Sequence, residues 1–277
     1  MPGNFKKLVH IYFVVFEYLF GTKNAEGSPI TMFVAGFVYS FISVPLALIL
    51  HKSAASVLAV ALATIAGIPL ILKIIEFESD LLDLYPETVL AREAKIIALY
   101  LWFFFGEIAG FTSSYLLLNG DDFSAATSYQ MKDLEYVEGL RSKITGQAAS
   151  KNPFEIVFWN NLKVYAIGML LSFIYGTGGV FILTWNASVI ATLLARDIST
   201  TGSITAGVLQ FLSILPHGIL EYGAYIVGGF TGGLISLLLL QKGWNKRLIF
   251  DTVVLLVSGV VLLYVGAVVE SAVLLSR

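Results

Sequence analysis

Long apolar stretches alternate with short polar segments along the whole chain. They cover residues 30–50, 53–75, 94–118, 163–185, 187–215, 218–240 and 248–275. An α-helix needs about 20 apolar residues to cross a hydrocarbon core of about 30 Å. The pattern therefore predicts an all-α fold, a polytopic transmembrane helical bundle of six or seven spans.

The first two stretches are separated only by His51 and Lys52, which predicts a tight helical hairpin. The segment from Glu76 to Glu93 is too acidic for the hydrocarbon region, so we expect it in water or among lipid headgroups. Residues 30–118 are thus interpreted as an amino-terminal set of transmembrane helices.

Residues 1–29 precede these helices and contain only a short apolar run. Lys6 and Lys7 lead an apolar run that is interrupted by His10 and Glu17, and no small-residue cleavage pattern follows. Because the run is short for a span, we predict an N-terminal interfacial helix along the bilayer surface and no cleaved signal peptide.

The connection over residues 119–161 is the longest polar part of the chain. Its stretch Ser124–Leu140 is compatible with a surface helix, whereas Gly139, Gly146 and Asn152-Pro153 are turn or breaker signals. We expect a polar connecting loop or cap here and no compact independent domain.

Residues 162–277 form a glycine-rich C-terminal transmembrane core in this interpretation. The stretch 187–215 is broken by Arg196-Asp197 and by Ser199–Gly202, which predicts either one kinked span or two half-helices in a re-entrant hairpin. With one crossing, the lysine-bearing loops are cytoplasmic, and residues 119–161 and the C-terminus face outward. With a re-entrant hairpin, the last loops would lie on the opposite sides of the membrane.

Composition narrows the functional classes. Of the 277 residues, 57% are hydrophobic and 13% are charged, about half the charged fraction of a soluble domain. The net charge of -2 without a concentrated basic face argues against nucleic acid as a partner, and the absence of cysteine excludes disulfides and thiolate chemistry. We expect a multi-pass protein of the cell membrane whose first partner is the lipid bilayer.

Familiar catalytic and cofactor motifs are missing. There is no serine-hydrolase elbow, His-Glu-x-x-His, Walker sequence or dinucleotide fingerprint, and Gly176-Thr177-Gly178-Gly179 lacks the lysine of a phosphate loop. The sequence predicts no cofactor.

Glycines mark one face of the stretch 218–240. Gly228 and Gly232 are four residues apart, as are Gly229 and Gly233, and Gly223 lies one turn earlier. Small residues at this spacing allow two helix backbones to approach closely. The face packs either inside the bundle or in a homodimer, and we favour internal packing.

The most unusual local sequence runs from Leu215 to Glu221 and reads Leu-Pro-His-Gly-Ile-Leu-Glu. Pro216 can start a helix, and His217 and Glu221 fall one turn apart on one face. Such a pair can be a structural hydrogen bond, a metal or catalytic site, or part of a transport path. Because a zinc site takes about three protein ligands and the other two histidines have interfacial contexts, the structural interpretation is favoured.

Asn160, Asn161 and Asn186 are expected at the ends of the stretch 163–185, where side-chain amides can cap helices. The alternative is that they meet His217 and Glu221 in one polar cluster, because polar groups inside a membrane seek one another. Both interpretations stay open at this point.

Two further glutamates lie in apolar stretches. Glu107 is near the middle of one, and Glu270 is near an end where water is within reach. Either could carry a proton or an ion, or could simply be protonated.

Asn160-Asn161, the run from Gly168 to Asn186 and the run from Leu215 to Glu221, followed by the glycine series, together resemble the stage II sporulation protein M family. The resemblance covers about residues 158–240 and looks closest to the archaeal branch, whose members also place extra helices before this core. The family's paired Asn and Pro-His-Gly-x-x-Glu features map onto Asn160, Asn161, Pro216, His217, Gly218 and Glu221.

The resemblance implies a polytopic membrane protein that is not known as an enzyme. In endospore-forming bacteria it belongs to an engulfment complex with two peptidoglycan-degrading partners, as their membrane scaffold. We carry over only the membrane-scaffold role, with other membrane or envelope proteins as expected partners.

The leading hypothesis is therefore a non-enzymatic scaffold or component of an envelope or membrane-remodelling complex. A transporter or permease-like subunit would instead line a polar path past His217 and Glu221, and a continuous water-filled cavity would favour it. An intramembrane metal-dependent hydrolase would use the same two residues with Asn160 or Asn161, and stoichiometric zinc would favour it.

Overall fold

A computed structural model describes residues 28–82, 89–145, 152–175, 178–240 and 246–275. These residues fold almost entirely into α-helices, and no strand occurs among them. The predicted interfacial helix within residues 1–29 lies outside the described residues, except for the last two positions.

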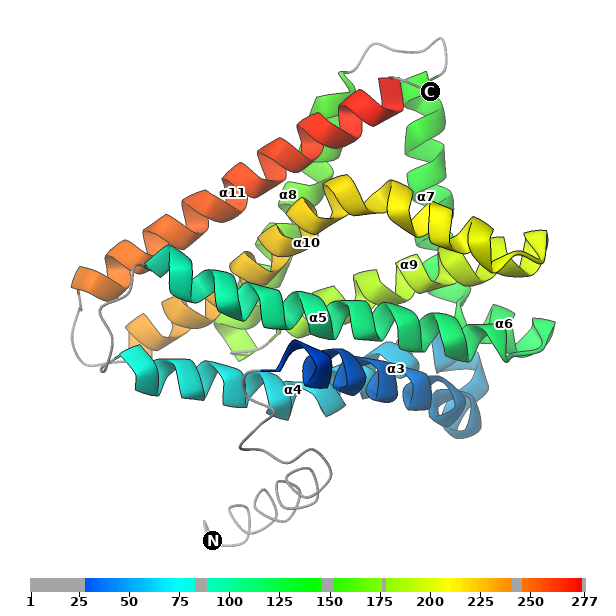
Figure 1. Ribbon diagram of the computed structural model, residues 1–277, viewed down its shortest axis with the longest axis horizontal. Helices are drawn as coiled ribbons and strands as arrows, with labels where there is room; N and C mark the ends of the chain where they lie inside the picture. The colour runs from blue at the N-terminus through cyan, green and yellow to red at the C-terminus, as the bar shows by residue number, and fades with distance from the viewer. Residues whose placement is uncertain (1–27, 83–88, 146–151, 176–177, 241–245, 276–277) are drawn as a thin grey trace, which may run out of the picture.

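The helices follow one another along the chain with short connections. Their bounds are α3 Pro29–His51, the 3-10 turn η1 Lys52–Ala54, α4 Ala55–Leu82, α5 Val89–Leu116, α6 Gly120–Ala126, α7 Ser128–Thr145, α8 Pro153–Tyr175, α9 Gly179–Thr201, α10 Ile204–Leu240 and α11 Lys246–Leu275. Figure 1 shows them in chain order from blue to red.

Six stretches of the described residues are long and apolar enough to cross a bilayer. The first, Pro29–Ile71, contains both α3 and much of α4, which pack against each other on either side of η1. The predicted hairpin and the predicted all-α membrane bundle are confirmed.

The amino-terminal helices α3, α4 and α5 pack together and against α9. Glycine makes the α3–α5 contact close, because a Cβ atom on Gly106 would collide with the Phe33 backbone oxygen and one on Gly36 would collide with the Phe103 backbone oxygen. Aromatic and aliphatic side chains such as Met32, Phe104 and Phe111 fill the space around this contact. This group is therefore closely packed.

The carboxy-terminal helices α8, α10 and α11 form a second packed group, and α9 joins it to the first. The ring of Tyr165 on α8 enters a space that Gly228 on α10 and Gly259 on α11 leave open, since a Cβ at either glycine would lie 2.7 Å from that ring. Figure 1 shows α8, α10 and α11 inclined to α5 and α9.

The helix boundaries in this half differ from the expected ones. Gly202 ends α9 in the left-handed conformation, with φ at 65°, so the polar break in residues 187–215 is the turn between α9 and α10. The expected interruption is thus present, but it separates two long helices, α9 of 23 residues and α10 of 37 residues, in place of one kinked span or two half-helices. Helix α8 ends at Tyr175 and α9 begins at Gly179, and α8 begins at Pro153, ten residues earlier than expected.

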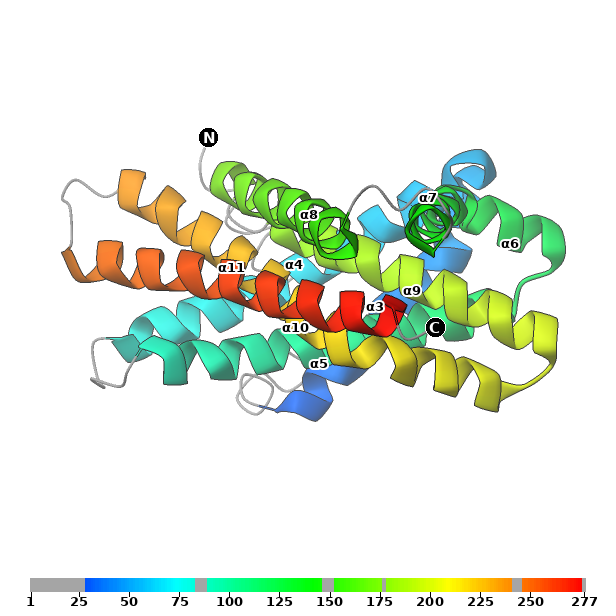
Figure 2. The same cartoon turned by 90° about the horizontal axis from the view of Figure 1, so that it is seen from above.

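Helix α7 runs across the direction of α5 and α9 in Figure 1, and Figure 2 views it nearly end-on. We call α6 and α7 together the cap. The cap, the turn η1 and the α9–α10 turn lie towards one end of the bundle, whereas α4 ends, α5 begins and α11 begins at the other.

Candidate functional site

One face of α10 carries a row of polar side chains. Gln210, Ser213, His217, Glu221 and Tyr225 follow at intervals of three or four residues, which places them above one another on an α-helix. His217 and Glu221 are each only 6% exposed. The row faces α11 and α8, the two helices that pack most closely on α10 in this group.

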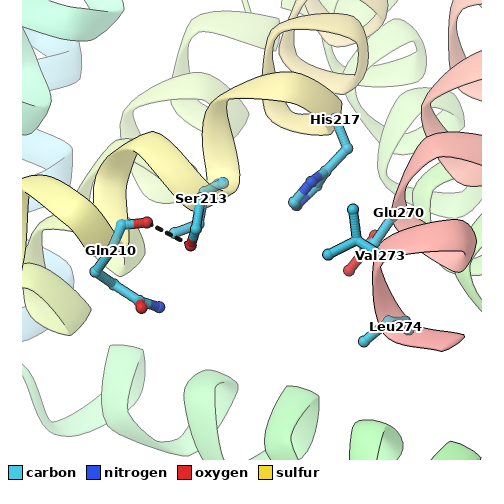
Figure 3. Close-up of a pocket in the computed structure, with 7 residues that line it drawn as sticks. Gln210, Ser213, His217, Glu270, Val273 and Leu274 are labelled. Atoms are coloured by element: carbon cyan, nitrogen blue, oxygen red, sulfur yellow. Dashed lines mark hydrogen bonds between the residues drawn. The ribbon is translucent and has the colours of Figure 1, made fainter. Parts of the chain in front are cut away.

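His217 and Glu270 line one small pocket between α10 and α11. Figure 3 shows the imidazole pointing from α10 into the space that Glu270 and Val273 of α11 enter. Gln210 and Ser213 continue the pocket wall along α10. The pocket thus combines side chains that are about 50 residues apart in the sequence.

Glu221 lies one turn deeper than His217 and packs on α11. A Cβ atom on Gly266 would come within 3.1 Å of the Glu221 Cγ, so this glycine leaves the room that the carboxylate side chain occupies. Glu221 is not among the residues that line the pocket. This pocket therefore reaches His217 and does not extend to Glu221.

Pro216 lies inside α10 and not at its start, which corrects the predicted helix start. Its ring is exposed, so it fills no space between helices. Figure 1 shows α10 changing direction along its length, the usual effect of an interior proline. Such a proline is tolerated in a membrane helix because neighbouring helices and local adjustments satisfy the freed backbone groups.

The three asparagines do not cap helices, because all of them lie inside α8 or α9. Asn161 is buried and its Oδ1 accepts a hydrogen bond of 2.9 Å from the Tyr225 hydroxyl, one turn beyond Glu221. Asn160 reaches only Asn161, at 3.5 Å. Asn186 donates to the Ile182 carbonyl of its own helix at 2.7 Å.

The structure therefore brings Asn161 to the polar row of α10 through Tyr225, and it places Asn186 elsewhere. Among the described residues, no three His, Asp or Glu side chains are arranged to hold a metal ion. Within the described ranges, His217 and Glu221 thus have no third carboxylate or imidazole placed to complete a zinc site.

The glycine face of α10 packs against α8 and α9. A Cβ on Gly232 would collide with the Met169 backbone, and one on Gly229 would lie 3.5 Å from the Gly179 Cα. Gly223 has more room, with the Leu262 side chain at 3.9 Å, and Gly233 is half-buried. The glycine face of α10 therefore packs against other helices inside the bundle.

Glu107 is the other glutamate inside the bundle. It is 1% exposed on α5, and its Oε1 accepts a hydrogen bond of 2.8 Å from the Thr184 hydroxyl on α9. The contact joins the amino-terminal helices to the carboxy-terminal core at one polar point.

Polar contacts hold the cap against the bundle. Gln130 on α7 has no exposed surface: its amide accepts from the Ser56 hydroxyl at 2.5 Å and donates to the Ser188 hydroxyl at 3.1 Å. The Trp185 ring nitrogen on α9 donates to Asp133 at 2.7 Å. One helix of the cap is thus bonded to both α4 and α9.

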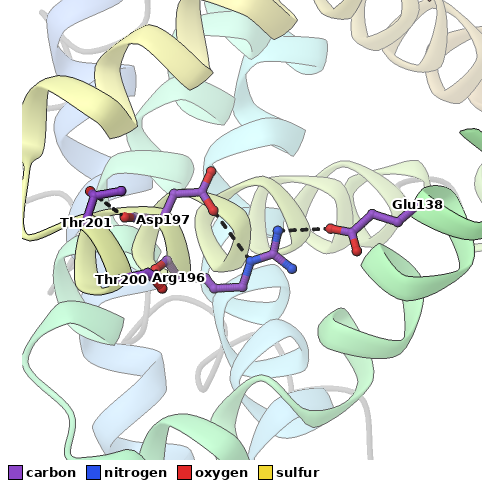
Figure 4. Close-up of polar contacts among 5 residues, drawn as sticks. All are labelled: Glu138, Arg196, Asp197, Thr200 and Thr201. Carbon is purple, nitrogen blue, oxygen red and sulfur yellow. Dashed lines mark hydrogen bonds and ion pairs between the residues drawn. The ribbon is translucent and has the colours of Figure 1, made fainter. Parts of the chain in front are cut away.

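Charged pairs add to these contacts. Arg196 on α9 bonds Glu138 on α7 at 2.9 Å, and Figure 4 shows its guanidinium between Glu138 and Asp197. The Lys52 ammonium lies 2.5 Å from Asp122 on α6. The hydrogen bond from Lys52 lowers the pKa of the Asp122 carboxyl below its ordinary value.

The exposed side of α7 carries both aromatic and charged side chains. Tyr129 and Tyr136 are 48% and 61% exposed, and the Lys132 ammonium lies 4.8 Å from the centre of the Tyr129 ring. The three residues are three or four positions apart, so they share one face of the helix.

The sequence interpretation missed several of these residues. Nothing in the pattern around Gln130, Ser56 or Ser188 indicates a buried contact, because single polar residues in polar or apolar surroundings carry no periodic signal. The close α3–α5 contact had a signal that was overlooked: Gly106 and Gly110 have the same four-residue spacing as the glycines of α10.

The sequence model of the family described as Stage II sporulation protein M matches residues 99–273, which is more than half of the chain. The matched range includes the cap, the polar row of α10 and all the residues that line the pocket except Leu274. No curated protein and no solved structure is similar enough to count as a match.

Proposed function

Because the chain belongs to the stage II sporulation protein M family, we propose that it is a non-enzymatic membrane scaffold within an envelope or membrane-remodelling complex. Its partners are other membrane or envelope proteins. The observation that supports the proposal is the firm attachment of the cap to helices that are built to span a bilayer.

A scaffold needs a surface that keeps its shape before a partner arrives, because preorganisation lowers the entropic cost of binding. Buried hydrogen bonds from Gln130, together with the Asp133–Trp185 and Glu138–Arg196 pairs, fix α7 at several points along its length. A buried amide that loses its partners is costly, so the contact resists loosening of the helix. The cap is therefore a rigid platform on the bundle.

The face of α7 that carries Tyr129, Lys132 and Tyr136 is the docking surface in this proposal. Tyrosine offers a large contact area with few rotatable bonds and a hydroxyl for hydrogen bonding, and it is common at the energetic centres of interfaces. The exposed tyrosines are held on a fixed helix and do not pack into the bundle.

His217 and Glu221 have a structural role in the proposal. Both are buried between α10 and α11, and Glu221 fits beside Gly266. Among the described residues they have no third carboxylate or imidazole to complete a metal site. The pair helps to hold two helices together.

Site-specific photo-crosslinking in the native membrane tests the proposal. A photo-reactive residue at Tyr136 is expected to give a discrete protein adduct, whereas one at Tyr264 on α11, which is 54% exposed, should give lipid adducts only. The protein in the adduct is then identified by mass spectrometry and tagged to recover the complex in the reverse direction. His217→Ala should leave the adduct in place.

Two substitutions on α7, one that loosens the cap and one that does not, are compared in the same crosslinking experiment. Gln130→Leu is expected to reduce the Tyr136 adduct, because the docking helix loses its fixed position, while Glu135→Gln on the exposed side of α7 should reduce it less. Lipid adducts alone at Tyr136 would contradict the scaffold proposal.

A further inference from the structure

Helix α8 lies at the edge of the bundle. It packs on α10, α11 and α9. In the most apolar part of α8, 28% of the residues are buried inside the protein, compared with 61% for α9. Figure 2 shows α8 along one margin of the molecule. The other side of the helix is therefore open to lipid or to another protein.

The open side of α8 is an apolar stripe that contains one charge. Trp159, Ile167, Leu170 and Ile174 are between 50% and 58% exposed, and their spacing places them on one face of the helix. Lys163 lies on this face, four residues from both Trp159 and Ile167, and is also exposed. It forms no ion pair with any residue that the structure describes. We call these five residues the α8 stripe.

Lys163 lies near the middle of its span. It is ten residues after Pro153 and twelve before Tyr175, which is about 15 Å and 18 Å along the helix axis. The packing of α11 indicates the same level, because Tyr165 contacts Gly259, which lies well inside the apolar stretch Ile249–Leu274. If α8 crosses the bilayer, Lys163 is therefore inside a hydrocarbon core of about 30 Å.

A charged lysine is costly at this depth. Near the end of a span, a lysine can extend its side chain along the helix and place the ammonium among the headgroups, but from the middle this reach is too short. Ionisable residues inside spans accordingly pair with one another or face a water-filled cavity. Lys163 does neither within the described residues, since Asn161 and Tyr165 mark the buried side of α8 and Lys163 points away from them.

We propose that the α8 stripe binds a transmembrane helix of another protein that carries an aspartate or glutamate at the level of Lys163. The ammonium and the carboxylate then form a charge-assisted hydrogen bond away from water. Lys163, Ile167, Leu170 and Ile174 are separated by four, three and four residues, the spacing of a seam between two membrane helices that cross at a small angle. The apolar members of the stripe pack around the charged pair.

A second copy of this chain does not supply the carboxylate. Two α8 helices related by a two-fold axis would bring their Lys163 side chains together, and like charges repel. Among the described residues, Glu107 and Glu221 are the carboxylates nearest the middle of a span, and both are buried. Glu155 is exposed on α8, but it lies eight residues from Lys163, about 12 Å along the axis. The partner is therefore a different protein.

Defined transmembrane peptides test the charge requirement with the full-length protein in phosphatidylcholine liposomes. One peptide is a leucine-alanine helix with a central aspartate, and the comparison peptide carries asparagine at that position. Binding is measured by energy transfer from a dye on Tyr175→Cys, the only cysteine in the protein. The aspartate peptide is expected to bind about tenfold more tightly, the difference between a charge-assisted and a neutral hydrogen bond.

Lys163→Met keeps an unbranched side chain without the charge and should abolish this preference. Lys246→Met removes the charge of an exposed lysine at the start of α11 and should keep it. Circular dichroism and gel filtration check folding, and Lys163→Gln provides a second uncharged variant if Lys163→Met fails to fold. Equal binding of the two peptides by the wild type, or an unchanged preference in a folded uncharged variant, would overturn the proposal.

Photo-crosslinking in the native membrane identifies the partner. A photo-reactive residue at Ile167 is expected to give an adduct with another membrane protein, and Lys163→Met should remove that adduct. Replacing the partner's intramembrane carboxylate by its amide should do the same, and Lys163→Glu combined with a lysine at the partner's position should restore the adduct. An adduct between two copies of this chain, or lipid adducts alone, would contradict the proposal. The scaffold proposal is tested at Tyr136 of the cap, so either proposal can fail while the other stands.

Discussion

Gln130 is a polar side chain with no exposed surface, at the point where α4, α7 and α9 meet. Gln130→Leu removes its bonds and leaves the hydroxyls of Ser56 and Ser188 with fewer partners. We expect a loss of about 1–3 kcal/mol in the free energy of unfolding, the cost of unsatisfied buried polar groups. Thermal or denaturant unfolding in detergent measures this loss.

Glu135→Ala on the exposed side of the same helix is the control for this substitution and should change the stability by at most about 0.5 kcal/mol. If both variants unfold at the same midpoint, Gln130 does not contribute to holding the cap.

Asp122 makes the attachment of α6 sensitive to acid. Its carboxyl accepts from Lys52 and from the Asn119 amide, and the Lys52 contact lowers its pKa in the folded protein. A carboxyl with a lowered folded pKa stabilises the fold at pH values above its unfolded pKa of about 3.9, and this contribution is lost as the pH falls through the folded pKa.

Limited proteolysis of the cap between pH 3 and pH 7 is expected to show this loss at the acid end. Asp122→Asn should remove the pH dependence that comes from this pair, and because the pair is exposed the effect should be small and weaker at high salt. A cap that opens equally in wild type and variant at every pH would contradict the assignment.

At the scale of the helices, glycine decides how closely α3 and α5 approach. Gly106→Ala places a methyl group against the Phe33 backbone, which cannot move as a flexible side chain would. We expect a loss of about 2 kcal/mol or more, measured as the unfolding midpoint in detergent, because the two helices must separate.

Gly223→Ala on α10 is the matched comparison, since its nearest neighbour is the end of the Leu262 side chain at 3.9 Å. This variant should be neutral or more stable by up to about 1 kcal/mol, the difference in helix propensity. Equal destabilisation by both alanines would mean that backbone approach is not what makes Gly106 necessary.

Helix number and type could be predicted from the sequence because the apolar runs are as long as a bilayer is thick. The bounds of α8 could not, since Asn160 and Asn161 look too polar for a span. Asn161 is accommodated through its bond to Tyr225, a residue 64 positions away. Such a partner is visible only after the helices have packed.

For the candidate site too, only the features that depend on local spacing could be predicted. The single-turn spacing of His217 and Glu221 is local and was correctly placed on one helix face, whereas their relation to Glu270 depends on the packing of α11 against α10. The prediction that Pro216 starts a helix was wrong for a related reason. From the sequence alone, a proline inside a membrane helix cannot be distinguished from a proline in the first turn of a helix.

At the scale of the whole molecule, the connections gather at two ends of the bundle. The cap, η1 and the α9–α10 turn lie towards one end, and the start of α11 lies at the other (Figure 1). If each of the apolar helices α3, α4, α5, α8, α9, α10 and α11 crosses a bilayer once, the chain crosses it an odd number of times between the start of α3 and the end of α11. The two ends of the bundle would then face opposite sides of the membrane.

The flanks of α3 indicate which side each end faces. Lys6, Lys7 and Lys23 precede α3 and only Lys52 follows it before α4, and the charge bias around the first span usually sets the orientation. We therefore predict that α11 begins on the cytoplasmic side and that the cap faces outward. The docking surface on α7 would then meet envelope partners.

The absence of cysteine in the chain makes this orientation directly measurable. Tyr136→Cys on the cap should react with a membrane-impermeant maleimide in intact cells, whereas Lys246→Cys at the start of α11 should react only after the membrane is permeabilised. Both positions are exposed, so a difference in labelling reports the side of the membrane and not burial. The cysteine-free protein sets the background. Labelling of Lys246→Cys but not Tyr136→Cys in intact cells would reverse the orientation and would move the docking surface, with its expected partners, to the cytoplasmic side.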